Sequence, residues 1–256
     1  MRSSLLRALR PSALRPACLR VVARDLSSST GAPKVAVVLA GCGVFDGSEL
    51  TEATSTLIHL SAAGVEYECF APNKDQFHAL DHTTGDEMAV PRNVMVEAAR
   101  ISRGAISPLG DLKSEDFSAL FIPGGFGAAK NLCNHATVAQ GDPSKLVVDP
   151  DLSKSLTAFQ QAGKPIGICC IAPVIAASVL KCKVTVGQAE GDKWPYGGTV
   201  GAIENYGGTH EATDIEGVCV DATAKVVTSP AYMYDGKPHE IYHSVGLMVT
   251  ETLKLV

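Results

Sequence analysis

One apolar run that ends on two adjacent cysteines constrains the fold more than any other stretch of this chain. Residues 163–173 read GKPIGICCIAP, and residues 166–169 are typical of a strand buried inside a sheet. Pro173 follows within four residues, and proline is tolerated in the first turn of a helix. The run therefore predicts a strand that delivers Cys170 to a sharp turn before a helix. At that position a helix dipole favours the thiolate of Cys170.

The rest of the sequence alternates apolar runs with segments of helical periodicity. Helix formation is expected to begin at Ser48 or Thr51, either of which can cap the first helix. Such alternation is typical of a doubly wound α/β sandwich with a mostly parallel sheet, and 256 residues suffice for one domain with one core. The predicted strands are 34–40, 65–72, 117–122, 166–169, 184–187, 218–220 and 225–230, and the predicted helices are 50–63, 93–103, 151–162, 172–180 and 240–255.

The first 30 residues differ in composition from the remainder. They carry six arginines, abundant Ser and Leu, and Asp25 as their only acid, with arginines interrupting every apolar stretch. This pattern favours a mitochondrial presequence over a secretory signal, and it predicts a matrix protein. A disordered or basic N-terminal tail is the alternative. We therefore divide the chain into a presequence at 1–30, cleaved or disordered, and a domain at 31–256.

Charge and cysteine content exclude several classes of protein. Without residues 1–30 the chain has 16 basic and 26 acidic residues and a formal charge of −10, which argues against nucleic acid as a partner. No apolar run reaches the roughly 18 residues that span a bilayer, so membrane insertion is not expected. Seven cysteines remain and form no C-x-x-C pair, so we expect reduced thiols and neither a disulfide framework nor a metal site.

Two glycine-rich segments follow predicted strands. The segment 41–48 matches neither G-x-G-x-x-G nor a P-loop, and it is instead interpreted as a loop that carries Asp46, Glu49 and Glu52 over a pocket. Gly124 and Gly125 follow the strand at 117–122. Two glycines can turn their N–H groups toward one point, as an oxyanion hole requires, although an ordinary glycine turn is also consistent with them.

These motifs together resemble the ThiJ/PfpI superfamily of class I glutamine amidotransferase-like proteins. Four segments carry the resemblance, which covers about residues 34–256: AGCGVFDGSE at 40–49, GGFGAAKNL at 124–132, CIAP at 170–173 and TSPAYM at 228–233. Within the superfamily they are most similar to the ElbB-type glyoxalase branch and its mitochondrial relatives. The resemblance implies a flavodoxin-like sandwich, a homodimer, and a nucleophilic cysteine at a strand-to-helix elbow.

The resemblance also implies which residues act. Cys170 would be the nucleophile and Glu52 its carboxylic acid partner, with Glu49, one turn earlier, as the alternate. Gly125 and Ile171, beside Gly124, would supply the amides of the oxyanion hole. The implied reaction converts a small aldehyde such as methylglyoxal, or an early glycation adduct, without a cofactor, through a thiohemiacetal and proton transfer by Glu52.

The sequence departs from the superfamily in its histidines. The stretch after the elbow helix reads Val186-Gly187-Gln188 where many members have a histidine, and His210-Glu211 and His239-Glu240 lack the intervening residue of an amidotransferase H-x-E motif. These departures argue against glutamine amidotransferase activity. Two other interpretations stay open: a redox-sensing or regulatory protein in which Cys170 oxidises to a sulfinate, and a cysteine that is only a packed turn residue.

Overall fold

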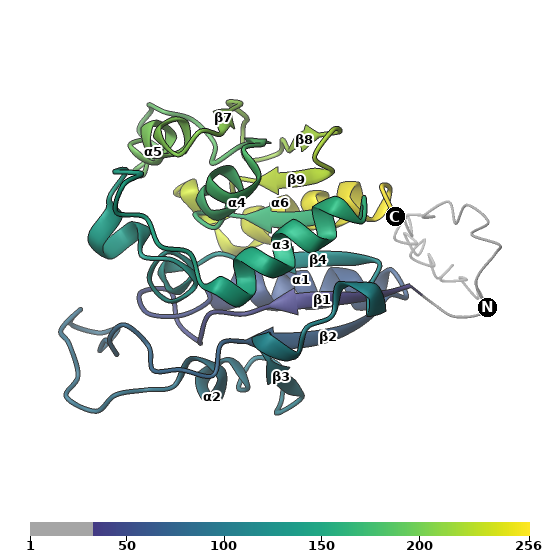
Figure 1. Cartoon of the computed structure of the whole chain (residues 1–256). Helices are drawn as coiled ribbons and strands as arrows, with labels where there is room; N and C mark the ends of the chain where they lie inside the picture. The colour runs from purple at the N-terminus through teal and green to yellow at the C-terminus, as the bar shows by residue number, and fades with distance from the viewer. Residues whose placement is uncertain (1–32) are drawn as a thin grey trace, which may run out of the picture. The chain divides into compact units, whose positions relative to one another are not determined.

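Seven strands form one sheet in the order β3-β2-β1-β4-β5-β9-β8 in a computed structural model that describes residues 33–256 (Figure 1). All neighbouring strands are parallel except β8, which pairs antiparallel with β9. The doubly wound, mostly parallel sheet expected from the sequence is thereby confirmed. The strands are β1 (Lys34–Val38), β2 (Glu66–Ala71), β3 (Ile106–Pro108), β4 (Ala119–Ile122), β5 (Ile166–Cys169), β8 (Cys219–Asp221) and β9 (Val226–Ser229).

Helices cover both faces of the sheet. In Figure 1, α3 and α4 lie in front of the strands, and α1 and α6 lie behind them and pack against each other. The helices are α1 (Leu50–Ala62), α2 (Val94–Ala98), α3 (Pro150–Gln161), α4 (Pro173–Leu180), α5 (Thr199–Asn205) and α6 (Pro238–Leu253). Short 3₁₀ turns occupy Leu109–Asp111, Ser114–Asp116 and Ala231–Met233, and short π-helical turns occupy Ala128–Leu132 and His135–Ala139.

The central strands are buried because helices cover both of their faces. Every residue of β4, β5 and β9 is buried, and their Ile, Val, Leu and Phe side chains suit a two-sided core. The order of the strands reverses direction between β1 and β4. In sheets of this kind ligands bind beyond the carboxyl ends of the strands at such a reversal. The loops after β1, β4 and β5 are therefore the expected place for a functional site.

Several predicted elements differ from the observed ones. Glu49, rather than Ser48 or Thr51, caps α1, because its side chain accepts the Glu52 N–H while the Ser48 hydroxyl is turned inward to the Ala40 N–H. The helix predicted at 93–103 is the single short α2, and the strand predicted at 184–187 is β6 (Lys183–Val184), which pairs with β7 (Thr209–His210) in a separate sheet. β3, β7 and α5 were not predicted.

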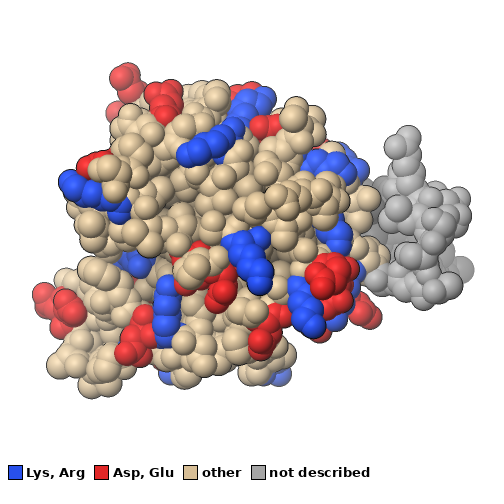
Figure 2. All heavy atoms as spheres, viewed as in Figure 1, with Lys and Arg blue, Asp and Glu red and all other residues tan. Residues whose placement is uncertain are grey.

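Three further predictions concern the N-terminus, membrane insertion and the charge of the surface. The predicted presequence at 1–30 is outside the described range, and the boundary after residue 30 stays a prediction. Within residues 33–256 no helix is long and apolar enough to cross a membrane. Figure 2 shows Lys and Arg interspersed with Asp and Glu on the visible face, without a broad basic area there.

Gly167, in the middle of β5, allows α6 to pack closely on the sheet. A Cβ at this position would lie 2.6 Å from Met248 Sδ and 2.7 Å from both Phe121 Cδ1 and Thr252 Oγ1. Because overpacking a filled core is destabilising, we expect Gly167→Ala to lower the free energy of unfolding by about 1–3 kcal/mol in urea denaturation. Gly201→Ala in α5, where a Cβ meets nothing within 4 Å, is the matched control. Equal midpoints for the two variants would contradict this description of the core.

Candidate active site

Cys170 occupies the turn between β5 and α4, as predicted. Its φ of 62° lies in the left-handed region that non-glycine residues rarely adopt, and its N–H donates to the Ser229 carbonyl of the adjacent strand β9 at 3.1 Å. Strained backbone of this kind is found at the nucleophile of strand-to-helix elbows. Cys170 is only 7% exposed and lines the cavity described below.

Glu52, on α1, lies directly beside Cys170. A Cβ built on Gly124 would overlap the Cys170 Cβ and lie 2.7 Å from Glu52 Oε2 and 2.9 Å from Cys170 Sγ, so the carboxyl and the thiol converge over this glycine. Glu52 is fully buried, and its Oε1 accepts the Tyr232 N–H at 3.1 Å. Its Oε2 has no hydrogen-bond partner of ordinary geometry among the described residues, although the Cys170 thiol is its neighbour. A buried, unpartnered carboxyl oxygen next to a thiol is suited to exchange a proton with it.

Glu49 occupies a different position from Glu52. Its Oε2 accepts the Glu52 N–H at 2.8 Å and its own N–H donates to the Gly124 carbonyl at 3.1 Å. Glu49 lines the cavity described below, whereas Glu52 lies behind the cavity wall. Of the two carboxyl groups that the sequence left as alternates, the structure therefore places Glu52 against the thiol and Glu49 at the start of the same helix.

Burial controls the protonation of this pair. It raises the pKa of Glu52 to about 8, and the charge of Glu49 adds to the increase, while the Tyr232 N–H, the Cys170 thiol and the Gly124 N–H oppose it. An apolar pocket and an adjacent thiolate were both predicted to raise this pKa; burial is indeed the largest cause, whereas the contact with Cys170 lowers the pKa. Burial, together with the charges of Glu52 and Cys169, also raises the pKa of Cys170 well above its ordinary value. The thiolate expected from the helix dipole is therefore not the resting form, because burial outweighs the dipole.

Backbone amides surround the thiol. The Gly125 N–H points at Cys170, and neither this N–H nor that of Ile171 donates to a carbonyl or side-chain acceptor among the described residues. The Gly124 N–H is directed at Glu52 and Cys169 instead. Of the three amides predicted for an oxyanion hole, that of Gly125 points at the thiol, that of Gly124 is directed at Glu52 and Cys169, and Ile171 is a residue of the cavity wall described below.

Cys170 opens into a cavity of about 330 Å³. The wall is mostly apolar and aromatic, and its residues are Val44, Glu49, Gly125, Phe126, Cys170, Ile171, Pro195, Tyr196, Tyr232, Met233, Tyr234, Asp235 and Gly236. Sequence reasoning did not assign the tyrosines to the pocket. A signal was available for Tyr232 and Tyr234, because they follow β9 at the same sheet edge as Cys170. Trp194 does not line the cavity but packs on Tyr234, with ring centroids 5.0 Å apart.

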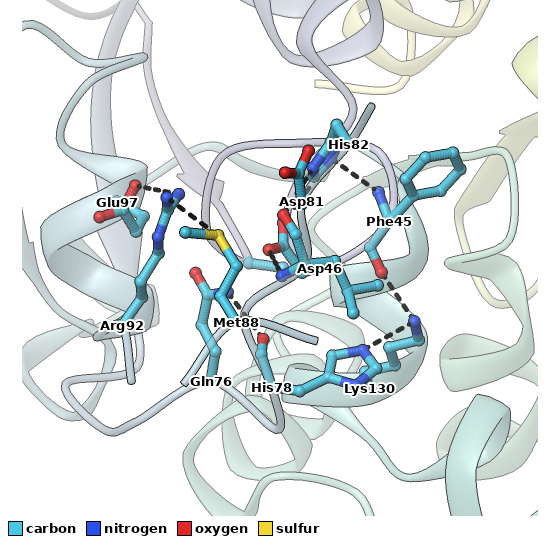
Figure 3. A network of polar contacts seen from close by, with 12 residues as sticks. Phe45, Asp46, Gln76, His78, Asp81, His82, Met88, Arg92, Glu97 and Lys130 are labelled. Atoms are coloured by element: carbon cyan, nitrogen blue, oxygen red, sulfur yellow. Dashed lines mark hydrogen bonds and ion pairs between the residues drawn. The ribbon is translucent and has the colours of Figure 1, made fainter. Parts of the chain in front are cut away.

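A network of polar contacts holds the loop that carries the cavity residue Val44 (Figure 3). Lys130 Nζ donates to the Phe45 carbonyl at 2.7 Å and to His78 Nε2 at 3.0 Å, and His82 Nε2 accepts the Phe45 N–H at 3.2 Å. Asp46 is 1% exposed and its Oδ2 accepts the Leu80 N–H at 2.8 Å. The expectation that Asp46 is one of the acids over the pocket was therefore wrong, since its carboxylate fastens residues 76–82 to this loop.

Comparison with known proteins identifies the family. No family model matches the chain. It is 46% identical over 237 residues to a human protein named glutamine amidotransferase-like class 1 domain-containing protein 3, mitochondrial, with 91% of this chain and 87% of that protein covered. A rat protein named ES1 protein homolog, mitochondrial, is 46% identical over 226 residues, covering 87% of this chain and 84% of that one. The chain belongs to this ES1 family. It is a mitochondrial protein.

Solved structures share the fold of this chain. A crystal structure from Ehrlichia chaffeensis, described as an isoprenoid biosynthesis protein with an amidotransferase-like domain, has a TM-score of 0.78 at 32% identity and covers 88% of this chain and 99% of its own. A ThiJ/PfpI domain protein from Brachyspira murdochii, at 13% identity and a TM-score of 0.51, covers 88% of this chain and 99% of its own and shares the fold. The flavodoxin-like, glutamine amidotransferase-like fold expected from the sequence is confirmed.

The amidotransferase-like name of the ES1 family is not matched by an assembled Cys-His-Glu triad in this chain. No histidine lines the cavity within the described residues. His210 lies in β7, where its Nε2 accepts the Val186 N–H at 3.3 Å, and His239 is an exposed residue in the first turn of α6. No three His, Cys, Asp or Glu side chains in residues 33–256 are grouped as metal ligands. The groups at the cavity are therefore the Cys170 thiol, the buried Glu52 carboxyl behind it, the Gly125 amide, and the carboxylates of Glu49 and Asp235 in the wall.

Proposed function

We propose that this protein is a cofactor-independent glyoxalase or deglycase that acts on 2-oxoaldehydes, such as methylglyoxal, or on their adducts. The observation that carries the proposal is the contact of Cys170 with the buried Glu52, whose pKa is raised to about 8, at the end of an aromatic cavity. A group that titrates near the working pH is an effective general acid and base. The mitochondrial relatives support the family, and the reaction is our inference.

The first step forms a carbon–sulfur bond. The ionised fraction of Glu52 takes the thiol proton as Cys170 Sγ attacks the aldehyde carbon, so no free thiolate has to accumulate. This route suits a cysteine whose pKa is raised by burial. The oxyanion of the thiohemiacetal then faces the N–H groups of Gly125 and Ile171, and Glu52 passes it the proton taken from the thiol, which completes the intermediate and restores the carboxylate.

The second step moves a proton along the substrate. Glu52 as carboxylate removes the proton from C1 and returns it to C2 of the resulting enediolate. The proton of the C1 hydroxyl passes to the C2 oxygen, which converts the thiohemiacetal into a 2-hydroxy thioester. Water cleaves the thioester, releasing the 2-hydroxy acid and restoring the thiol. The sum is 2-oxoaldehyde plus water giving 2-hydroxy acid, with C1 oxidised and C2 reduced internally. The scheme therefore calls for no external oxidant or cofactor.

The proposal is tested by product analysis. Purified protein is incubated with methylglyoxal without added metal, glutathione or nucleotide, and lactate is measured by NMR. We expect lactate to accumulate catalytically and the rate to increase with pH through about pH 8, as Glu52 ionises. Folded protein that forms no lactate would contradict the proposal. The homodimer and the matrix location expected from the sequence stay predictions.

The redox-sensing alternative is separated in the same preparation. Peroxide reacts with thiolates, so the raised pKa of Cys170 argues against rapid oxidation of this cysteine. Mass spectrometry after a limited peroxide dose measures the oxidation of each cysteine separately. Selective sulfinate formation at Cys170, in protein that produces no lactate, would favour the sensor over the enzyme.

A further inference from the structure

We propose that the cavity selects its ligands by charge, accepting neutral and cationic molecules and excluding carboxylates, and that Glu49 is the residue that determines this selection. The inference deepens the proposed function, on which it rests for the identity of the site, by naming the substrate class: aldehydes that are uncharged or carry an ammonium-type group. Anionic 2-oxo acids such as glyoxylate would be rejected.

The charged residues that line the cavity are of one sign. Glu49 and Asp235 are its only ionisable carboxylates, and no Lys, Arg or His is among its lining residues. Two lysines outside this lining approach its residues: Lys193 Nζ lies 3.9 Å from Asp235 Oδ2 and 5.8 Å from the centre of the Tyr234 ring, and Lys130 Nζ lies 5.4 Å from the centre of the Phe126 ring. The Lys193–Asp235 pair is the ion pair at the cavity. Because both side chains of that pair are well exposed, the charge of Asp235 is offset and screened.

Glu49 is not offset in this way. It forms no ion pair with any basic side chain among residues 33–256, and it is only partly exposed. One carboxyl oxygen is engaged by the Glu52 N–H, and its backbone packs against Gly125 beside the thiol. A carboxylate fixed here acts on any ligand that reaches Cys170. A second carboxylate in the same cavity would be repelled, because interactions between charges strengthen away from bulk water.

The aromatic residues of the wall also favour cationic over anionic ligands. Phe126 and Tyr196 meet edge to face with ring centroids 5.9 Å apart, and Tyr232 and Tyr234 complete the wall. Lys130 and Lys193 lie over the rings of Phe126 and Tyr234, so Tyr196 and Tyr232 are the rings that carry no lysine among residues 33–256. Aromatic faces carry negative potential and attract cations within about 6 Å of the ring centre. The volume of about 330 Å³ also leaves more room than a three-carbon aldehyde fills. An uncharged or cationic substituent on the aldehyde would therefore fit both the space and the potential.

The test uses three ligands of one shape and three charges: choline, its uncharged isostere 3,3-dimethylbutan-1-ol, and the anion 3,3-dimethylbutyrate. Binding is followed by the fluorescence of Trp194, the one tryptophan of the chain, which packs on the cavity residue Tyr234. We expect the dissociation constant of choline to be at least about tenfold below that of the carboxylate, with the alcohol between them. None of the three reacts with a thiol, so the result does not depend on turnover.

Two variants locate the effect. Glu49→Gln keeps an oxygen that can accept the Glu52 N–H, and we expect it to reduce the cation-to-anion ratio to about threefold or less. Glu216→Gln, an exposed acid outside the cavity, removes the same charge and should leave the ratio unchanged. Equal or tighter binding of the carboxylate, no binding of choline, or an unchanged ratio in Glu49→Gln would each overturn the proposal. Selective choline binding by protein that forms no lactate would overturn the proposed reaction and leave the charge selection standing.

Discussion

Glu52→Gln is expected to lower kcat/KM for methylglyoxal by about 10²–10⁴-fold, because the amide cannot take a proton from the thiol or from C1 of the substrate. The increase of the wild-type rate through about pH 8 should also disappear, since it reports the ionisation of Glu52. Lactate formation measured from pH 6 to 9 gives both results.

Glu49→Gln is the informative control, because it keeps Glu52. The increase of its rate with pH should occur at lower pH than in the wild type, because the charge of Glu49 raises the pKa of Glu52. A kcat/KM of Glu52→Gln within tenfold of the wild-type value would contradict the role of Glu52.

The same substitution, Glu52→Gln, is expected to increase stability relative to the wild type as pH rises. The folded-state pKa of Glu52, about 8, lies above its ordinary value of 4.5, so between these values the native state binds a proton that the unfolded chain has lost. Stability of the wild type therefore decreases as pH rises through this window, by about 1.4 kcal/mol per unit. We expect Glu52→Gln to gain about 4 kcal/mol relative to wild type between pH 5 and pH 8. Urea unfolding at the two pH values measures this difference. A difference that does not depend on pH would show that Glu52 ionises normally.

Gly124→Ala is expected to disable the site by moving the Cys170 thiol and the Glu52 carboxyl apart. The new Cβ would overlap the Cys170 Cβ and come within 2.7 Å of Glu52 Oε2, so the elbow or α1 has to shift. A displacement of about 1 Å between reacting groups costs about 10²-fold in rate, and strain in a packed region costs about 1–3 kcal/mol of stability. The measurements are lactate formation and urea unfolding of the variant.

Gly201→Ala controls for the added methyl group, since position 201 has open space around it. It should retain the wild-type rate. Folded Gly124→Ala that turns over methylglyoxal at the wild-type rate would mean that Cys170 and Glu52 do not act as the pair described.

The elements that local pattern determines were predictable from the sequence. Buried apolar runs and a proline in the first helical turn placed β5, Cys170 and α4 within a residue or two, because periodicity and backbone restrictions act over short distances. β3 and α5 lacked such a pattern: β3 has three residues and none is fully buried, and α5 follows the glycine-rich stretch around 197–198.

The chemistry of the site depends on contacts between distant parts of the chain. The resemblance assigned Glu52 to Cys170, but only the fold shows that Tyr232, 180 residues away, donates its N–H to that carboxyl. The direction of the Cys170 pKa followed from burial, which the sequence does not give for one side chain. Asp46 was misassigned for the same reason, since its partner Leu80 lies in a segment without helical or strand periodicity.

The rate of lactate formation from methylglyoxal by Cys170→Ser, compared with Cys42→Ser, tests the central claim most directly. Both substitutions replace one sulfur atom by oxygen, but Cys42 is a half-buried cysteine outside the cavity. Because a serine hydroxyl is a far weaker nucleophile than a thiol at this pH, we predict a loss of about 10³-fold or more for Cys170→Ser and a wild-type rate for Cys42→Ser. Equal rates for Cys170→Ser and the wild type would contradict the proposal that this thiol forms the covalent intermediate.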